Sequence, residues 1–337
     1  MIPRLPAPGA VGASLGVAVG KFNPPHLGHL HLVLTAAQIA DRIVVLLCDR
    51  QDQTIGAGLR RTSLLDSCPS NVEVFVTPDD LPEAPEPWAA RALQILGRRP
   101  DVAFTSEDWG PAWAEAMGAR HVMVDSERSA FPISGTALRA DLGASFGWLV
   151  PGARAALARR VVLVGAESTG KSTLAEALAA ALGTVWVPEY GRWYWQGRRH
   201  LADQRWTIDE FDRIAACQHR VAADLARKAM HGIVIGDTDA LATAVWLERY
   251  LGTTSRAIDH LVQVQRPALY LVCAPDFDWV QDGTRDSGVQ RQAMHEVTLR
   301  RVEATGLPWL VLTGSHDERL ERAVDAVRPL TLFQPLR

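Results

Sequence analysis

The sequence predicts an α/β protein with two doubly wound parallel-sheet domains, one after the other along the chain. Short apolar runs typical of buried parallel strands alternate with helix-like segments along most of the chain. Two of these runs lead directly into a turn of small residues and a helix start, about 140 residues apart. The length of 337 residues suits about two ordinary domains.

The composition is that of a globular protein with sizeable cores. Hydrophobic residues make up 47% of the chain and charged residues 22%. The 35 lysines and arginines nearly balance the 38 aspartates and glutamates, whereas a general nucleic-acid binder is clearly basic. We therefore expect small anionic ligands held by local positive sites, and no nucleic-acid partner.

Nothing in the sequence indicates secretion or membrane insertion. The four cysteines, Cys48, Cys68, Cys217 and Cys273, are far apart and contain no Cys-x-x-Cys pair, which favours free thiols over a disulfide framework. The proline-broken N-terminus lacks the apolar stretch of a secretory signal, and no apolar run approaches the ~18 residues of a membrane span. We expect a cytoplasmic protein.

The first predicted domain spans residues 15–145, after a flexible N-terminus at 1–14. A helix is expected from Gly28 to about Ala40, and residues 78–87, rich in proline and acids, are expected to form a loop. Ligands of such a sheet bind at the carboxyl ends of its strands. The strands are expected at 15–19, 43–47, 72–76, 102–105 and 121–124.

A connector is expected at residues 146–158, followed by the second domain at 159–337. Its strands are expected at 161–164, 185–188, 233–235, 269–273 and 310–312. Its helices are expected at 171–182, 207–230, 238–251, 288–305 and 317–328.

The first phosphate signature is Gly20-Lys21-Phe22-Asn23-Pro24-Pro25-His26-Leu27-Gly28-His29. Two imidazoles near a helix start can donate to a polyphosphate, and the prolines hold the turn rigid. This suits attack on an α-phosphorus with pyrophosphate leaving, because positioned donors stabilise the charge on phosphate oxygens. We expect His26 and His29 to be catalytic, assisted by Lys21. Packing histidines are the alternative, and a metal site lacks cysteine or carboxylate partners.

A second element of the same domain is Ile133-Ser134-Gly135-Thr136-Ala137-Leu138-Arg139. Ser134 and Thr136 are expected to cap a helix start, from which Arg139 reaches the same phosphates. The two elements together resemble the HIGH-type nucleotidyltransferases, in which such motifs jointly hold ATP. The resemblance implies an ATP-binding set of Gly20, Phe22, His26, Gly28, His29, Ile133, Ser134, Thr136 and Arg139.

The second signature is a full P-loop behind the strand at 161–164. Its backbone amides are expected to wrap the β-phosphate of ATP, with Lys171 between the β- and γ-phosphates and Ser172 on Mg²⁺. The motif alone does not distinguish a kinase from a GTPase or an ATPase. Its expected ATP-binding residues are Gly165, Glu167, Ser168, Thr169, Gly170, Lys171, Ser172 and Thr173.

Later residues favour a small-molecule kinase. Glu189 follows the second strand of this domain and is expected to bind a ribose hydroxyl and to accept the proton of the attacked 5′-hydroxyl. Asp237 follows the next strand, the position of a carboxylate that acts on the Mg²⁺ shell. Solvated loop carboxylates are the alternative for Glu189 and Asp239. The expected riboside-binding residues are Glu189, Tyr190, Arg192 and Asp239.

Residues 279–286, followed by Arg291, resemble a phosphate-closing lid in which Arg285 and Arg291 are the cations. Trp193, Trp195, Trp206 and Trp246 are expected to pack, although one of them, or Tyr190, is a candidate to cover a pyridine ring. The sequence does not choose among them.

An adenylyltransferase followed by a P-loop kinase resembles the NadR family over nearly the whole chain. The resemblance implies phosphorylation of nicotinamide riboside to NMN at the second site, then adenylyl transfer to NMN at the first, giving NAD and pyrophosphate. It implies Mg²⁺ with ATP at both sites. Trp109, and less directly Trp88, are expected to stack on the nicotinamide ring, with loop anchoring as the alternative. The most specific segments are 20–29, 105–110, 133–139, 165–173, 189–192, 237–239 and 282–285.

Three alternatives stay open at this point. One domain alone is active and the other senses a nucleotide, or both act on a different nucleoside or nucleotide, or the chain is a non-enzymatic regulator. Some family members carry an N-terminal helix-turn-helix domain; about 14 residues precede the first strand here, so we expect no transcriptional regulation. The sequence leaves open a homo-oligomer, the relative activity of the domains, feedback by NAD and channelling.

Overall fold

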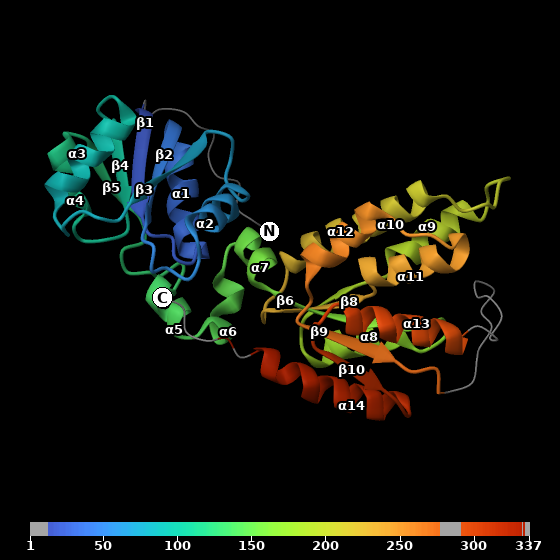
Figure 1. Ribbon diagram of the computed structural model, residues 1–337. Helices are drawn as coiled ribbons and strands as arrows, with labels where there is room; N and C mark the ends of the chain where they lie inside the picture. Colours follow the sequence, from blue (N-terminus) through green and yellow to red (C-terminus); the bar gives the residue numbers. More distant parts are fainter. Residues whose placement is uncertain (1–12, 277–290, 332, 334–337) are drawn as a thin grey trace. The chain divides into compact units, whose positions relative to one another are not determined.

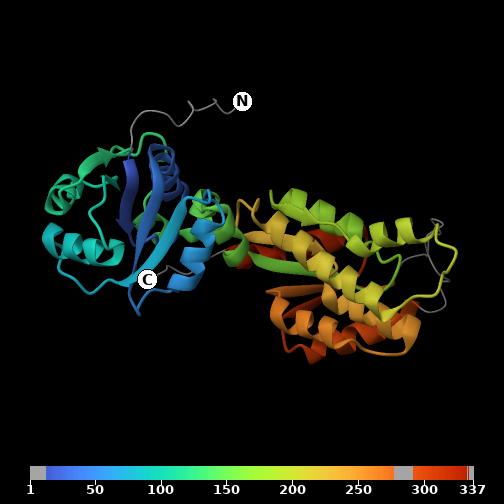
Figure 2. The same ribbon diagram turned by 90° about the horizontal axis from the view of Figure 1, so that it is seen from above.

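A five-stranded parallel sheet forms the centre of each of the two units into which the chain divides (Figure 1). The computed structural model describes residues 13–276, 291–331 and 333. The first unit extends to Ala156 and the second starts at Leu157. Figure 2 shows helices on both faces of each sheet, which is the doubly wound architecture that the sequence predicts.

The first sheet has the strand order β3-β2-β1-β4-β5, and all its pairings are parallel. The order reverses between β1 and β4, so the carboxyl ends of these two strands form the switch point where ligands of such sheets bind. The strands are β1 (Ala13–Gly20), β2 (Ala40–Asp49), β3 (Val72–Pro78), β4 (Val102–Thr105) and β5 (Arg120–Met123).

Two apolar layers hold the helices of the first unit to the sheet. On one face, α1 and α2 pack on Val45, Leu47 and Phe104, and on the other, α3 and α4 pack on Leu15 and Val17. The alternation follows from the period of two along each strand. The helices are α1 (Leu27–Ile39), α2 (Ala57–Leu65), α3 (Pro85–Leu96), α4 (Gly110–Met117), α5 (Gly135–Ala140), α6 (Leu142–Ser145) and α7 (Pro151–Leu157), with a 3₁₀ turn at Phe146–Trp148.

Two sequence expectations are corrected in this unit. The segment expected as a connector, 146–158, packs almost entirely within the first unit: Phe146, Leu149 and Val150 are fully buried. The Val150 amide donates to the Pro25 carbonyl at 3.2 Å, next to the histidine motif. The expected loop at 78–87 ends early, because Pro85 begins α3, a position that tolerates the missing N–H of proline.

The second sheet has the order β10-β9-β6-β8-β7, again with parallel pairings. The order reverses between β6 and β8, and the P-loop follows β6. The five predicted strands are all present. They are β6 (Arg159–Val164), β7 (Val185–Val187), β8 (Ile233–Asp237), β9 (Leu269–Cys273) and β10 (Trp309–Leu312).

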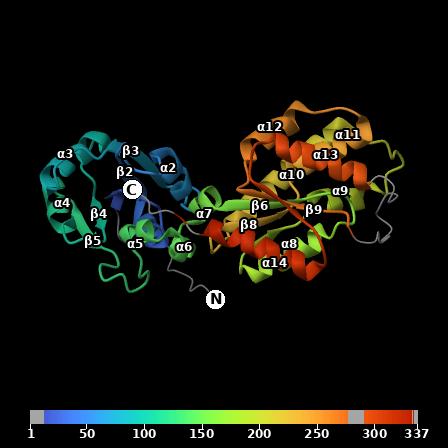
Figure 3. The same cartoon turned by 60° about the horizontal axis from the view of Figure 1, so that its bottom comes forward.

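Helices α8 and α14 cover one face of this sheet and α10 to α13 lie on the other (Figure 3). The P-loop helix α8 buries Leu174 and Leu178 against α14, whereas Leu241 and Val245 of α11 belong to the opposite layer. The helices are α8 (Lys171–Ala181), α9 (Tyr190–Arg198), α10 (Ile208–Ala226), α11 (Ala240–Leu251), α12 (Arg256–Gln265), α13 (Arg291–Ala304) and α14 (His316–Val327), then a 3₁₀ turn at Arg328–Thr331.

Some expectations fall on residues that the structure does not describe, namely most of the N-terminal segment 1–14 and the lid segment with Arg285. Among the helices of the described residues, none is both long and apolar enough to cross a bilayer.

Candidate functional sites

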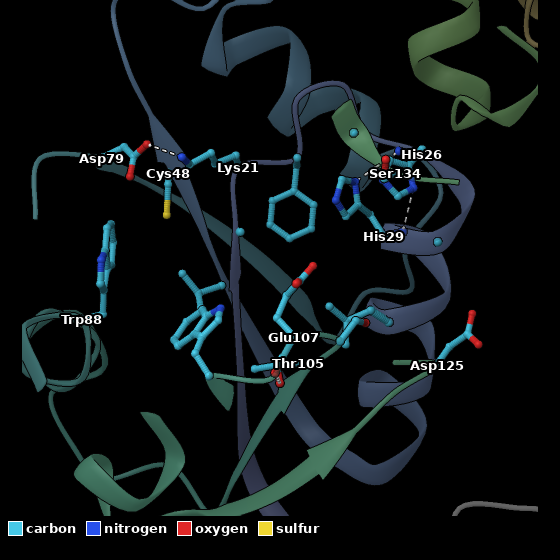
Figure 4. A pocket seen from close by; sticks show the side chains of 18 of the residues that line it. Lys21, His26, His29, Cys48, Asp79, Trp88, Thr105, Glu107, Asp125 and Ser134 are labelled. Carbon is cyan, nitrogen blue, oxygen red and sulfur yellow. Dashed lines mark hydrogen bonds and ion pairs between the residues drawn. The ribbon is translucent and has the colours of Figure 1, made fainter. Parts of the chain in front are cut away.

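A cavity of about 570 Å³ lies at the carboxyl ends of β1 and β4 in the first unit (Figure 4). Most of the residues predicted for the adenylyltransferase site meet in its wall. In Figure 4, His26, His29 and Ser134 lie on one side of this space, and Trp88 and Asp79 lie on the other. The predicted residues that line it are Gly20, Lys21, Phe22, His26, Gly28, His29, Ile133, Ser134, Trp88 and Trp109.

The two histidines of the motif cap α1 reciprocally. The backbone N–H of His29 donates to Nδ1 of His26 at 3.3 Å, and that of His26 donates to Nδ1 of His29 at 3.4 Å. The rings stack with centroids 3.6 Å apart. Because each Nδ1 accepts a hydrogen bond, a neutral ring carries its proton on Nε2.

Burial keeps both imidazoles neutral. It lowers the pKa of His26 to about 4, and the nearby Arg128 guanidinium acts in the same direction. The pKa of His29 is lowered well below its usual range by burial first, then by His26, Arg128 and Arg139. The pair therefore offers N–H donors rather than a base or a permanent cation.

A buried arginine fixes the turn in front of these histidines. Arg60 of α2 is fully buried and donates to the carbonyl of Lys21 at 2.6 Å and to that of Cys48 at 3.1 Å. It also pairs with Asp49. Phe22, one residue further, is buried in a left-handed conformation with φ +47°. Since a bulky residue avoids this region, the surrounding contacts must hold the turn there.

The predicted second motif behaves only in part as expected. Ser134 caps α5 by accepting from the Ala137 amide at 3.1 Å, and it lines the cavity. Thr136 and Arg139 are not among the residues that line the cavity. Arg139 instead donates to the Asn23 carbonyl at 2.7 Å and to Thr136 Oγ1 at 3.1 Å, so it holds the phosphate turn from behind.

The cavity contains a cation that the sequence analysis missed. Arg128 lies in the loop between β5 and α5, has a left-handed backbone with φ +53°, and lines the cavity. Its Nη2 lies 3.2 Å from Oε1 of Glu107, another lining residue. A single arginine in a loop has no motif of its own. The only signal was that this loop joins the last strand to Ile133 and so passes the strand ends.

The far side of the cavity combines aromatic rings with an ion pair. Trp88 is 8% exposed and Trp109 is 39% exposed, and both line the cavity. Lys21 does not point freely into the space, because its Nζ lies 3.3 Å from Oδ2 of Asp79 (Figure 4). The loop that carries Trp109 leaves no room for a side chain at Gly110, where a Cβ would come within 1.9 Å of Thr105 Oγ1.

A second cavity, of about 240 Å³, lies at the P-loop in the second unit. The loop has its expected backbone: Gly165 has φ +144°, and a Cβ there would come within 2.6 Å of the Cys273 carbonyl. Lys171 Nζ donates to the Ala166 carbonyl at 2.7 Å. The predicted residues in its wall are Glu167, Ser168, Thr169, Gly170, Lys171, Ser172, Thr173, Glu189 and Arg192.

Here too a buried arginine supports the phosphate loop. Arg319 of α14 is 2% exposed and donates to the carbonyls of Thr169 and Ala274, both at 3.0 Å, and pairs with Asp276. Arg291, predicted for the lid, is the first residue of α13 and donates to the Ser168 carbonyl at 3.0 Å. Arg291 therefore contacts the P-loop directly.

Two carboxylates meet near Lys171. Burial raises the pKa of Glu189, and Asp237 adds to this, whereas Lys171 and Arg192 oppose it. Burial also raises the pKa of Asp237, opposed by Lys171 and by a hydrogen bond with Ser172. Asp237 Oδ1 is buried without a hydrogen-bond partner in the described structure. That orphaned oxygen beside a hydroxyl fits an Mg²⁺ shell.

The described residues contain no cluster of three or more His, Cys, Asp or Glu side chains that would hold a metal alone. Mg²⁺ held by Ser172 and Asp237 would therefore complete its coordination with phosphate oxygens and water, as this ion commonly does.

Two of the residues predicted to bind the riboside, Asp239 and Tyr190, do not line the cavity. Asp239 is 6% exposed and caps α11 through the Leu241 amide at 2.9 Å, and it accepts from the Tyr270 hydroxyl at 2.8 Å. Thr238, with φ +72°, turns the chain so that Asp239 faces that helix instead of the cavity. Tyr190 does not line the cavity either; a hydrogen bond with Cys217 is the main cause that raises the pKa of its hydroxyl.

The aromatic wall of the second cavity consists of Trp195, Trp206, Phe211, Trp246 and Tyr250. Tyr250 stacks on Trp246, with ring centroids 5.6 Å apart, and on Trp206, at 5.8 Å. Trp193 is 50% exposed and lies outside the wall. Of the aromatic residues that the sequence offered for covering the pyridine ring, Trp195, Trp206 and Trp246 therefore line the cavity.

Comparisons with known proteins agree with this division. Residues 17–141 match a cytidylyltransferase-like family, and residues 160–319 match an AAA domain family. The trifunctional NAD biosynthesis/regulator protein NadR of Salmonella typhimurium is 25% identical, and that of Escherichia coli 26% identical, over 94% of this chain and 83% of theirs.

Two solved structures share the fold at 22% identity. One is a NadR protein in complex with NR, with a TM-score of 0.71 over 95% of this chain and 96% of the other. The second is a NadR protein in complex with NAD and AMP-PNP, with a TM-score of 0.68 over 95% and 97%.

The fold and the two cavities define a protein with a nucleotidyltransferase domain followed by a P-loop domain of the kinase type. Each domain has its predicted phosphate-binding turn at a switch point of its sheet. Over 94% of its length the chain is similar to the NadR proteins of NAD biosynthesis.

Proposed function

We propose that this chain is a bifunctional NAD salvage enzyme. It phosphorylates nicotinamide riboside with ATP at the second cavity and transfers the adenylyl group of another ATP to NMN at the first. The observation that carries the proposal is the presence of two separate phosphate cradles, each within its own folding unit. The names of the relatives, and the NR, NAD and AMP-PNP bound in solved structures, support the choice of substrates.

At the second cavity, the 5′-hydroxyl oxygen of the riboside attacks the γ-phosphorus, and the bond from this phosphorus to ADP breaks. Glu189 accepts the hydroxyl proton. Arg192, 4.0 Å from Glu189 Oε2, and Lys171 favour the ionised carboxylate against its burial. Ser172 and Asp237 would hold Mg²⁺, which would neutralise charge at the phosphates.

The aromatic wall of the same cavity suits the pyridinium ring. Trp206, Tyr250 and Trp246 form a continuous stack, and the faces of such rings attract a flat cation. We assign recognition of the pyridine ring to this wall rather than to Tyr190.

At the first cavity, a phosphate oxygen of NMN attacks the α-phosphorus of ATP, and pyrophosphate leaves. No proton has to move in this step, so donors are needed rather than a base. The Nε2–H group of His26 provides one of them, and that of His29 provides a second when it exchanges its hydrogen bond with the Pro24 backbone for one with the phosphate. Arg128 and the capped start of α5 at Ser134 add positive potential. Trp88 and Trp109 are assigned to the nicotinamide end.

The test is a reaction of the purified protein with ATP, Mg²⁺ and nicotinamide riboside, with products identified by mass spectrometry. We expect NMN and NAD together. Lys171→Ala should abolish NMN formation and preserve adenylation of supplied NMN, and His29→Ala should do the reverse. Loss of both partial reactions in either folded variant would contradict two separate sites, and ADP without a nicotinamide product would contradict the substrate.

Mg²⁺ and a cytoplasmic location are parts of the same proposal. Chelation by EDTA should stop both partial reactions, and added Mg²⁺ should restore them.

A further inference from the structure

One buried side chain forms two hydrogen bonds with the backbone on either side of Glu189, the residue to which we assign proton transfer in the kinase site. We call this pair of hydrogen bonds the bracket. Gln218 of α10 is 3% exposed. Its Oε1 accepts from the backbone N–H of Tyr190 at 2.6 Å, and its Nε2 donates to the carbonyl of Pro188 at 3.2 Å. These two groups flank Glu189 on either side, and Gln218 also lines the cavity.

The local structure explains why such a bracket is needed. Strand β7 ends at Val187 and α9 begins at Tyr190, so the backbone N–H and carbonyl groups between them lack hydrogen bonds from either element. Glu189 occupies the N-cap position of α9, but its side chain makes no capping hydrogen bond. A buried peptide N–H or carbonyl without a partner costs stability, and a glutamine amide offers the same donor and acceptor as a peptide.

The bracket fixes the backbone from which the Glu189 carboxylate extends. Glu189 Oε2 lies 4.0 Å from Arg192 Nε, and Oε1 lies 3.8 Å from the site of a Cβ at Gly191. The carboxylate thus lies in the wall of the cavity, and neither of its oxygens accepts a hydrogen bond from the start of α9. A general base displaced by about 1 Å can lose roughly 100-fold in rate.

We propose that Gln218 is a positioning residue of the kinase site, which clamps both peptide groups around Glu189 and so holds the carboxylate at the 5′-hydroxyl. This inference rests on the proposed phosphorylation of a riboside with Glu189 as base. It assigns to Gln218 an effect on the rate of phosphoryl transfer, not on the affinity for either substrate.

Two substitutions test it. Gln218→Met keeps the length and removes both hydrogen bonds; we expect kcat of phosphorylation to fall roughly 10- to 100-fold, with KM for riboside and ATP within about twofold. Gln218→Glu keeps the acceptor for Tyr190 and loses the donor to Pro188. We expect an intermediate kcat and an acid limb of the pH profile moved to higher pH, because a second carboxylate disfavours ionisation of Glu189.

Adenylation of supplied NMN by the same protein provides the internal control and should not change. Gln263→Met, at an exposed position on α12, is the matched control in the kinase domain and should behave as wild type. If Gln218→Met no longer binds ATP by calorimetry, the kinase domain has been damaged and Gln218→Glu carries the test.

The inference is overturned if Gln218→Met keeps kcat within about twofold, or if only KM rises, since the side chain would then be structural or a substrate contact. Full kcat in Glu189→Gln also overturns it, because there would be no base to position. Failure of the proposed function is seen separately, in a wild-type protein that makes no NMN from riboside and ATP; that result overturns both.

Discussion

Replacing Arg60 by methionine should selectively destabilise the adenylyltransferase domain. The change removes two hydrogen bonds from a charged donor to the buried carbonyls of Lys21 and Cys48, whereas the partner Asp49 is 34% exposed and can be rehydrated. Hydrogen bonds from charged donors contribute about 1.5–3 kcal/mol each, so the loss of two is roughly 3–6 kcal/mol. For a domain of this size that lowers the melting temperature by about 10 °C.

The assay measures both partial reactions after incubation at increasing temperature. Adenylyl transfer by Arg60→Met should be lost about 10 °C earlier than in wild type, while phosphorylation is unaffected. Arg319→Met, which removes the corresponding support of the P-loop, should give the opposite pattern. Arg42→Met is the matched control, because its ion pair with Glu73 is about half exposed on both sides and contributes under about 1 kcal/mol. A loss in Arg60→Met no larger than in Arg42→Met would refute the reasoning.

Three further predictions follow from the geometry of the two cavities. The pKa of His26 is lowered to about 4, so below about pH 6.5 the folded domain binds fewer protons than the unfolded chain. The free energy of unfolding should therefore be highest above pH 6.5 and should fall as the pH is lowered toward 4. The accompanying fall in melting temperature should be smaller in His26→Gln. Arg128→Gln should raise KM for ATP in adenylyl transfer about tenfold. Glu107→Gln removes the partner of Arg128 and should lower this KM by up to about fivefold. If both substitutions shift KM in the same direction, Arg128 does not bind the phosphates of ATP. Trp206→Ala should raise KM for the riboside about tenfold, and Trp193→Ala, outside the wall, should leave it unchanged.

Much of the fold could be predicted because strand signals in buried parallel sheets are strong and local. In the part of the chain that the structure describes, each of the ten strands overlaps a segment where the sequence predicts one. The P-loop and the histidine motif were equally local, since each is a strand, a turn and a helix start in continuous sequence. Helices α9 and α12 were missed for different reasons. The apolar residues of α12 do recur with a helical period and could have been recognised, whereas α9 combines aromatic residues with two glycines, and the first N–H of α9 is paired with a side chain of α10.

Where the placement of a site residue differs from the one expected, the physical cause is the same: position after a strand does not fix where a side chain points. Asp239 follows β8 by two residues, yet the left-handed Thr238 directs it onto α11 and Tyr270. Conversely, Arg60 and Arg128 reach the first site from a helix and from a loop that carry no motif. Their roles depend on contacts between segments far apart in the chain, which one sequence does not display.

The reciprocal cap on the two imidazoles has a thermodynamic corollary. Each Nδ1 accepts a hydrogen bond at the start of α1, and neither ring takes up a proton during the reaction. The protonation state of the two histidines is therefore the same before and after pyrophosphate leaves. Microscopic reversibility then requires the same donors to serve pyrophosphate when it attacks a dinucleotide. The direction of net adenylyl transfer is then set by the concentrations of ATP, NMN, NAD and pyrophosphate, as for any catalyst.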